Sequence, residues 1–180
     1  MSKTSAQALL VIDTQVGVFA SAYRRRETIA AIRVVIDKAR AASVPIIWVQ
    51  HADEEMPLES EDWQIVSELT RDSAEVLVHK TFRSAFEQTN LRELLAEHSA
   101  SHLILCGAET NNCIRHTAHS ALEQGLSVTL VSDGHTTTGF EWGGFTVDAA
   151  RTIDEQNTNF LNYELPGRTA RAVTSADLVF

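Results

Sequence analysis

Positively charged residues are scarce in this chain of 180 residues. It has 15 lysines and arginines against 24 aspartates and glutamates, which gives a formal net charge of −9 at pH 7. Proteins that bind nucleic acid or anionic membranes through general electrostatics need a positive field at their surface. The acidic balance therefore disfavours both nucleic acid and membranes as partners.

Cysteine is scarce too, and Cys106 and Cys113 are the only two. They form no Cys-x-x-Cys pair and no zinc-like spacing with histidine, so we expect two free thiols. No apolar run approaches the roughly 20 residues that are needed to cross a membrane. The polar residues 1–7 contain no apolar signal core, and we therefore expect a reducing, cytoplasmic location.

The composition that remains is ordinary for a globular protein, with 44% hydrophobic and 22% charged residues. A chain of this length can bury about two-thirds of its unfolded surface and needs no disulfide scaffold. The sequence has no internal repeat, no low-complexity tract and no recognisable linker. The range 1–180 is therefore predicted to form a single domain.

Short apolar runs alternate with helical patterns along almost the whole chain. The runs that predict strands are residues 8–12, 45–49, 76–78, 103–106 and 128–131, with a weaker one at 172–174. The patterns that predict helices cover 29–39, 62–69, 91–95, 113–124 and 147–160, and residues 136–145 are expected to form a long loop. Continuous apolarity is typical of strands buried on both faces of a parallel sheet. The sequence thus predicts a three-layer α/β/α fold with a mostly parallel sheet of about six strands.

Reactive side chains follow three of the predicted strands. Asp13 follows the first strand, Lys80 follows the third, and Cys113 begins the helix after the fourth. Because ligands bind beyond the carboxyl ends of strands in open parallel sheets, these three side chains could converge. Taken separately, Asp13 could cap a turn, Lys80 could be a surface residue and Cys113 could be a buried small hydrophobe.

Taken together, the three side chains make chemical sense as a nucleophilic site. A helix N-terminus and a nearby lysine ammonium both stabilise a thiolate, so we expect a lowered pKa at Cys113. A carboxylate beside them could accept the thiol proton and later activate a water molecule. Asp13, Lys80 and Cys113 are therefore the candidate catalytic residues.

Four stretches of the sequence carry a family resemblance. They are residues 9–15 with Asp13, residues 78–80 with Lys80, residues 106–114 with a Gly-x-x-Thr-x-x-Cys pattern, and residues 131–137. With these stretches the chain resembles the isochorismatase-like cysteine hydrolases, in the superfamily of nicotinamidase and N-carbamoylsarcosine amidase. The resemblance covers about residues 6–165, which is nearly the full chain.

The resemblance implies a Rossmann-like parallel sheet flanked by helices, a small-molecule substrate, and a homo-oligomer, either a dimer or a tetramer. It implies that Asp13, Lys80 and Cys113 form the catalytic triad. It also implies a non-proline cis peptide bond between Ala108 and Glu109. In such enzymes this turn aims backbone N–H groups at an oxyanion, and here the donors would be those of Glu109 and Cys113.

The region after the second predicted strand argues against a metal site. Nicotinamidases carry an Asp-x-His motif and a further histidine there. This chain has His51, but Val49 stands where the aspartate is needed and no second histidine follows before His79. Since a metal needs several preset ligands, we expect no catalytic metal and no other cofactor. Asp53 and Glu54 leave open a weak cation site.

A cysteine nucleophile favours hydrolysis of a C–N bond in a small amide, carbamoyl or ureido compound, through a thioester at Cys113. The alternatives are an isochorismatase-type hydrolase, which cleaves a vinyl ether without needing a thiol, and a non-catalytic binding protein of the same fold. A phosphoryl-transfer enzyme is disfavoured, because no glycine-rich loop follows the first strand. The candidate substrate-binding residues are Gln15, Phe19, Trp48, Gln50, Trp63, Phe82, His116 and Trp142.

Overall fold

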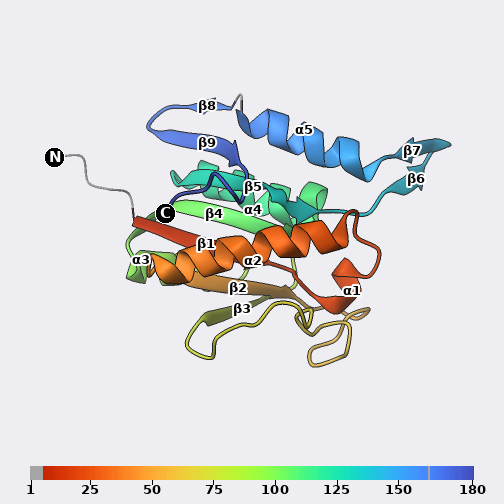
Figure 1. Ribbon diagram of the computed structural model, residues 1–180, viewed down its shortest axis with the longest axis horizontal. Coiled ribbons are helices and arrows are strands. Elements are labelled where there is room, and N and C mark those ends of the chain that lie inside the picture. The colour runs from red at the N-terminus through yellow and green to blue at the C-terminus, as the bar shows by residue number, and fades with distance from the viewer. Residues whose placement is uncertain (1–5, 162) are drawn as a thin grey trace.

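The computed structural model describes residues 6–161 and 163–180, and a central sheet runs through it (Figure 1). Its strands are β1 (Ala6–Ile12), β2 (Ile46–His51), β3 (Val76–Lys80), β4 (Ala100–Ala108), β5 (Ser127–Thr136), β8 (Glu164–Leu165) and β9 (Arg168–Val173). Their order across the sheet is β3-β2-β1-β4-β5-β9-β8. All neighbouring pairs are parallel except β8 with β9. The predicted parallel sheet is confirmed, and its seventh strand is the short antiparallel β8.

Strand β1 lies in the middle of the sheet and shows why its sequence is continuously apolar. Its residues 8–12 are fully buried. Successive side chains of a strand point to opposite faces, so Leu10 and Ile12 enter one hydrophobic cluster while Leu9 and Val11 enter another. Each face of β1 therefore needs apolar residues, and the alternation expected of a half-exposed strand is absent.

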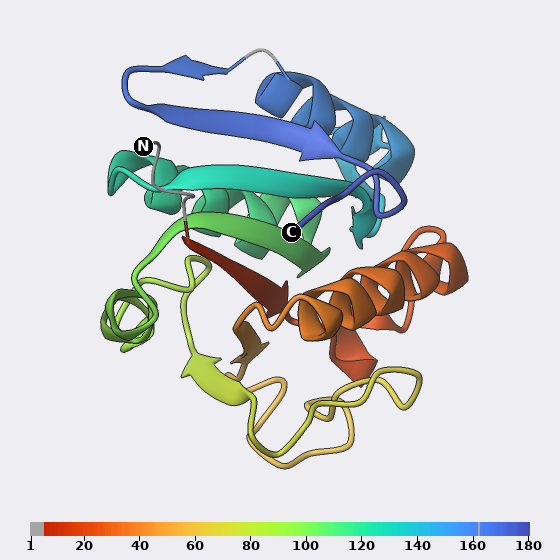
Figure 2. The ribbon, with the colours of Figure 1, turned by 60° about the vertical axis from the view of Figure 1, so that its left-hand side comes forward.

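Helices cover both faces of the sheet (Figures 1 and 2). They are α2 (Arg25–Ala41), α3 (Leu91–Glu97), α4 (Arg115–Glu123) and α5 (Ala149–Leu161), and α1 (Val16–Phe19) is a single turn. The apolar stripe of α2 packs in the cluster of Leu9 and Val11. Side chains of α3, α4 and α5 pack in the cluster of Leu10 and Ile12. The predicted three-layer α/β/α architecture is confirmed.

The predicted helix at residues 62–69 is wrong, because this segment forms turns. The carbonyls of Asp62 and Gln64 accept hydrogen bonds from the N–H groups of Gly17 and Val16, at 2.9 and 2.8 Å. The N–H group of Val66 donates to Thr14 at 3.0 Å. The backbone groups that a helix would pair internally are instead used to hold the start of α1.

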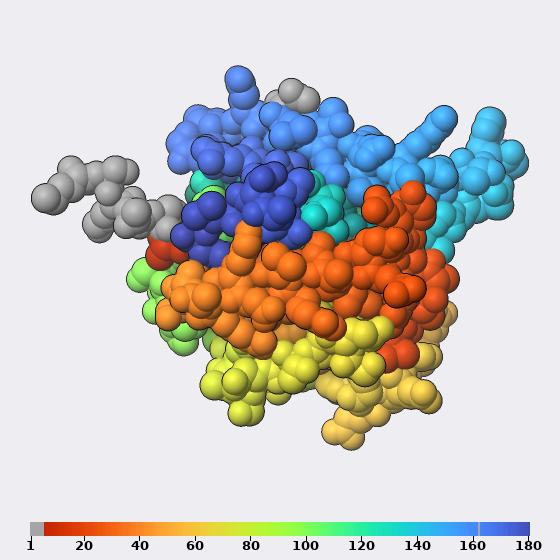
Figure 3. Space-filling model, viewed as in Figure 1, coloured from red at the N-terminus to blue at the C-terminus, as the bar shows by residue number. Residues whose placement is uncertain are grey.

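The predicted loop at residues 136–145 is also wrong. Strand β5 continues to Thr136, and a hairpin of β6 (Phe140–Trp142) and β7 (Phe145–Val147) follows. Gly143 and Gly144 both have positive φ, at 56° and 82°, which suits the two-residue turn between the strands. The hairpin projects from the body of the molecule (Figures 1 and 3).

Membrane insertion finds no support in the helices. Within residues 6–161 and 163–180, none of them combines the length and the apolar character that crossing a bilayer requires.

Candidate active site

Asp13 occupies the position directly after β1, at the carboxyl edge of the sheet. Its backbone N–H donates to the carbonyl of Val49 at 2.8 Å, and its φ is 49°. The neighbouring strand β4 approaches closely at Gly107, where a Cβ would lie 1.8 Å from the carbonyl oxygen of Ile12. Glycine at this position therefore lets β4 reach the end of β1, next to Asp13.

Lys80 ends β3 and reaches across to Asp13. Its Nζ lies 2.7 Å from Asp13 Oδ2 and 3.1 Å from Cys113 Sγ. The side chains of Lys80 and Asp13 are 0% and 2% exposed. The structure thus brings together the three side chains that the sequence analysis singled out, and places an ammonium between a carboxylate and a thiol.

Cys113 lies on a tight turn between β4 and α4. Residues Thr110–Ile114 form a single π-helical turn, η1, so the helix begins three residues earlier than predicted. The peptide bond between Ala108 and Glu109 is cis. The carbonyl of Glu109 accepts hydrogen bonds from the N–H groups of Asn112 and Ile114, both at 3.1 Å. These bonds hold the turn that carries the thiol.

A buried network of hydrogen-bonded side chains also supports this turn. Thr110 Oγ1 lies 2.8 Å from His135 Nδ1, and His135 Nε2 lies 3.0 Å from Asn157 Oδ1 on α5. Burial lowers the pKa of His135 to about 4, so the imidazole is neutral near pH 7. The network therefore links the nucleophile turn to α5 without adding charge.

The thiol of Cys113 is protonated in the resting site. Burial raises its pKa to about 12, the Asp13 carboxylate adds to the rise, and Lys80 opposes it. For Lys80, burial lowers the pKa, but Asp13 and Cys113 more than compensate and the pKa is raised. The expected low thiol pKa is wrong for this state, because desolvation and the Asp13 carboxylate together outweigh the effect of Lys80.

Asp13 is placed to act as the base that the resting thiol needs. Its Oδ1 is buried and accepts no hydrogen bond from the described part of the chain. Transfer of the Cys113 proton to this carboxylate would move the negative charge from oxygen to sulfur, on either side of Lys80. The ammonium would face one negative group before and after the transfer, so the net charge of the site would not change.

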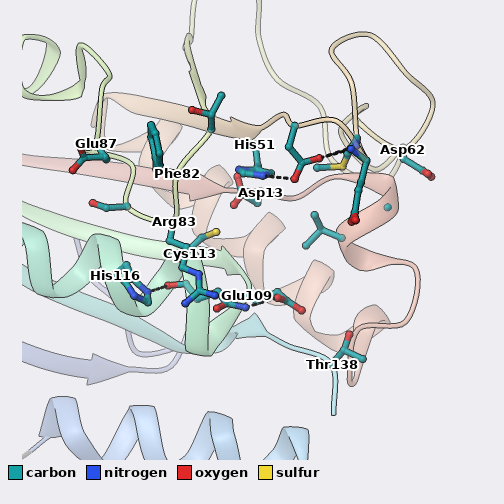
Figure 4. A pocket seen from close by; sticks show the side chains of 18 of the residues that line it. Asp13, His51, Asp62, Phe82, Arg83, Glu87, Glu109, Cys113, His116 and Thr138 are labelled. Carbon is teal, nitrogen blue, oxygen red and sulfur yellow. Dashed lines mark hydrogen bonds and ion pairs between the residues drawn. The ribbon is translucent and has the colours of Figure 1, made fainter. Parts of the chain in front are cut away.

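A cavity of about 1050 Å³ opens over Asp13 and Cys113 (Figure 4). Its walls come from the ends of β1 and β2, the loop at residues 53–62, the loop that follows β3, the η1 turn and α4. Among the predicted substrate-binding residues, Phe82 and His116 line it. The cavity is large enough for a small-molecule substrate.

Gln15 and Gln50, which the sequence predicts to contact substrate, have a different role. Their side-chain amides form hydrogen bonds with backbone groups. Gln15 Nε2 donates to the carbonyls of His51 and Trp63, at 2.9 and 3.0 Å, and Gln15 Oε1 accepts from the N–H of His51. Gln50 Nε2 donates to the carbonyl of Trp63 at 2.7 Å. Both residues are buried and do not line the cavity. They hold the loop that forms one of its walls.

The other predicted aromatic contacts also lie away from the cavity. Phe19 and Trp48 are buried in the core on the α2 face, at 0% and 1% exposure. Trp63 stacks on His79 with ring centroids 5.5 Å apart. Trp142 is 76% exposed on the β6 strand. Aromatic residue type alone predicts that these residues bind substrate. Packing and the path of the loops decide which of them line the cavity.

His51 is a site residue that sequence reasoning missed. Its Nδ1 lies 3.4 Å from Lys80 Nζ, its Nε2 lies 2.9 Å from Asp53 Oδ2, and its ring lines the cavity. Figure 4 shows its side chain close to those of Asp13 and Cys113. His51 ends β2 in register with Lys80 on β3, and this pairing is seen only in the structure. No cluster of three or more metal-ligating side chains occurs within residues 6–161 and 163–180.

Two known proteins illustrate what the chain is similar to. Streptothricin hydrolase of Streptomyces noursei is 29% identical over 138 residues, which cover 73% of this chain and 54% of that protein. Nicotinamidase 3 of Arabidopsis thaliana is 30% identical over 147 residues, which cover 72% of this chain and 73% of that protein. The chain therefore spans about half the length of the streptothricin hydrolase.

A solved structure and a family model agree with these similarities. The crystal structure of an isochorismatase from Pseudomonas putida KT2440 superposes with a TM-score of 0.86 at 25% identity, covering 99% of this chain and 92% of that one. The family model described as the isochorismatase domain matches residues 7–156. Since this match spans most of the chain, the protein belongs to the isochorismatase family of hydrolases.

Proposed function

We propose that this protein is a cysteine hydrolase that cleaves the C–N bond of a small amide, carbamoyl or ureido compound. The observation that carries the proposal is the position of Lys80, whose Nζ lies 2.7 Å from Asp13 Oδ2 and 3.1 Å from Cys113 Sγ beside a cavity of about 1050 Å³. A thiol, a base and a cation in contact are what acyl transfer through sulfur requires.

The first half-reaction forms a thioester. Asp13 accepts the proton of Cys113, and the sulfur attacks the carbonyl carbon of the substrate. The negative charge that develops on the carbonyl oxygen is received by the backbone N–H groups of Glu109 and Cys113, where one such donor is worth about 3 kcal/mol. The C–N bond then breaks as Asp13 returns its proton to the departing nitrogen, so an amine or ammonia leaves and the acyl group stays on sulfur.

The second half-reaction returns the enzyme to its starting state. Asp13, again a carboxylate, takes a proton from water while the oxygen attacks the thioester carbon. The C–S bond breaks, the acid product leaves and the proton on Asp13 returns to sulfur. Lys80 keeps its proton throughout, because no step requires it to give one up. It faces a carboxylate or a thiolate until sulfur bonds to carbon, and the negative charge then lies on the carbonyl oxygen.

The names of the relatives support this class of reaction. One is named a streptothricin hydrolase and the other a nicotinamidase, and an enzyme that hydrolyses an amide cleaves a C–N bond. A vinyl ether is the alternative substrate in this family. Cleavage of a vinyl ether would leave the protonated thiol, and the free carboxylate oxygen beside it, without a function. The geometry therefore favours attack by sulfur on a carbonyl carbon.

A panel of small amides, carbamoyl compounds and ureides, followed by mass spectrometry of the intact protein, tests the proposal. We expect an acyl adduct on Cys113 with at least one compound and complete loss of turnover in Cys113→Ala. The matched control is Cys106→Ala, since Cys106 is fully buried in β4 and lies outside the cavity lining. Full turnover in Cys113→Ala would contradict the proposal, and so would a panel that gives neither adduct nor hydrolysis.

A further inference from the structure

The Lys80 ammonium has a third neighbour that the proposed reaction does not use. An ammonium carries three N–H donors and no acceptor. Two of the donors are directed at Asp13 Oδ2 and Cys113 Sγ. The remaining contact is with His51 Nδ1, at 3.4 Å.

We propose that His51, oriented by Asp53, is a positioning residue that holds the Lys80 ammonium in line with Cys113 and Asp13. The inference rests on the proposed function, because it assigns His51 a part in preparing the same thiol. His51 acts through Lys80 and does not itself touch the reacting atoms.

Asp53 determines which nitrogen of His51 carries the proton. Asp53 Oδ2 lies 2.9 Å from His51 Nε2, and a carboxylate can only accept, so Nε2 carries the hydrogen. Asp53 is itself fixed, because its Oδ1 accepts from the N–H groups of Glu55 and Met56, at 2.9 and 2.8 Å. The hydrogen bond with His51 is the main cause of the lowered pKa of Asp53. The lone pair of Nδ1 is therefore left to face Lys80.

The backbone of His51 is held as firmly as its ring. Gln15 accepts from the His51 N–H and donates to the His51 carbonyl, both at 2.9 Å. In the β2–β3 pairing His51 lies in register with Lys80, and the N–H of Ala52 donates to the Lys80 carbonyl at 3.0 Å. The acceptor is thus preorganised beside the ammonium and does not depend on a mobile side chain.

The charged and titratable groups facing Lys80 come from three elements besides its own strand. Asp13 follows β1, His51 ends β2 and Cys113 lies on η1. If the third acceptor were lost, one N–H of a buried ammonium would be left without a partner, which is costly. The ammonium would then reorient, and its stabilisation of the thiolate at Cys113 would weaken.

The test is the rate at which iodoacetamide alkylates Cys113 between pH 7 and 10, followed by mass spectrometry of the full chain. His51→Leu removes the acceptor, and we expect roughly tenfold slower alkylation, with the pH profile displaced to higher pH. His51→Asn places an amide oxygen near the position of Nδ1, so its rate should stay within about twofold of the parent protein.

His79→Leu is the matched control. It makes the same substitution one residue before Lys80 on β3, where the imidazole stacks on Trp63 and the side chain points to the opposite face of the strand from Lys80. We expect its alkylation profile to match that of the parent protein. Equal rates in His51→Leu and His51→Asn, whether both normal or both slow, would overturn the proposal, because the acceptor would then not matter.

The two proposals can fail separately. Alkylation reports on the thiol and needs no substrate, whereas the amide panel reports on turnover. If His51→Leu slows alkylation as expected while no panel compound is hydrolysed, the positioning role stands and the amidase function is overturned. If panel compounds acylate Cys113 while the His51 variants alkylate alike, the reverse holds.

Discussion

At the scale of single residues, the site depends on a pair of buried opposite charges. The Lys80 and Asp13 side chains are almost fully buried, and their charged atoms are 2.7 Å apart. Groups buried this deeply stay charged only when they are paired, because neither can be solvated. The pair therefore has a structural role in addition to its part in the proposed reaction, and removing one member affects both.

Replacing Lys80 separates these two effects. Lys80→Met leaves Asp13 buried and unpaired, and the free energy of unfolding at neutral pH should fall by about 3–5 kcal/mol. The double variant Asp13→Asn/Lys80→Met removes both charges and should recover most of that loss while remaining inactive. Denaturant unfolding of the three proteins measures the difference, and a double variant as unstable as Lys80→Met would contradict the pairing.

Asp13→Asn should change thiol reactivity and turnover in opposite directions. The carboxylate helps to raise the pKa of Cys113 to about 12, so its removal lowers that pKa and exposes more thiolate at a given alkaline pH. We expect roughly tenfold faster alkylation by iodoacetamide at pH 9. Turnover should be lost, because no base remains to activate water. Slower alkylation in Asp13→Asn would show that the carboxylate does not oppose ionisation of the thiol.

At the scale of helices and strands, the sequence predicts the central elements well and the connections poorly. The run at residues 8–12 predicts a doubly buried strand because each face of β1 contacts a separate apolar cluster. The convergence of Asp13, Lys80 and Cys113 was predictable too, since parallel strands end at one edge of a sheet. Helix periodicity at residues 62–69 misled, because long-range hydrogen bonds to residues 14–17 replace helical ones.

The lining of the cavity was the least predictable part of the site. Gln15 and Gln50 are polar residues near the strand ends, and nothing in their types shows that backbone carbonyls use up their amides. The sequence shows His51 only as a lone histidine in an incomplete metal motif. Its contact with Lys80 follows from the register of β2 and β3, which a single sequence does not reveal.

Gly107 in β4 is a position where adding a single methyl group should strongly lower the stability of the protein. Its φ is +121°, and an added Cβ would lie 1.8 Å from the carbonyl oxygen of Ile12. Gly107→Ala should therefore lower the free energy of unfolding by at least about 3 kcal/mol, through strain and displacement of β4. Gly125→Ala is the control, since Gly125 also has positive φ but a Cβ there meets nothing within 4 Å.

The control should cost only about 1 kcal/mol, which is the conformational penalty alone. Thermal or denaturant unfolding measures both variants. Equal losses at Gly107 and Gly125 would mean that β4 can move away from β1 without cost, contrary to the close approach seen beside Asp13.

At the scale of the whole molecule, the site takes its residues from strands that differ in how many neighbours they pair with in the sheet. Strand β1 is flanked on both sides, by β2 and β4, whereas β3 is an edge strand that pairs with β2 alone in the described sheet. The cation of the proposed triad comes from this edge strand, and the base comes from the centre. The dimer or tetramer implied by the family resemblance, and the cytoplasmic location, stay predictions.

The edge position of β3 has a consequence for how the enzyme loses activity. Local opening at an edge costs less free energy than global unfolding, and hydrogen exchange detects it amide by amide. We expect the amides of Val76–Lys80 to exchange with solvent at lower denaturant concentration than those of β1, and turnover to decline over the same range. Exchange of both strands at the global rate would contradict this. If β3 opens first, as we expect, loss of activity begins when this edge strand frays and Lys80 leaves the site, while the rest of the sheet is still folded.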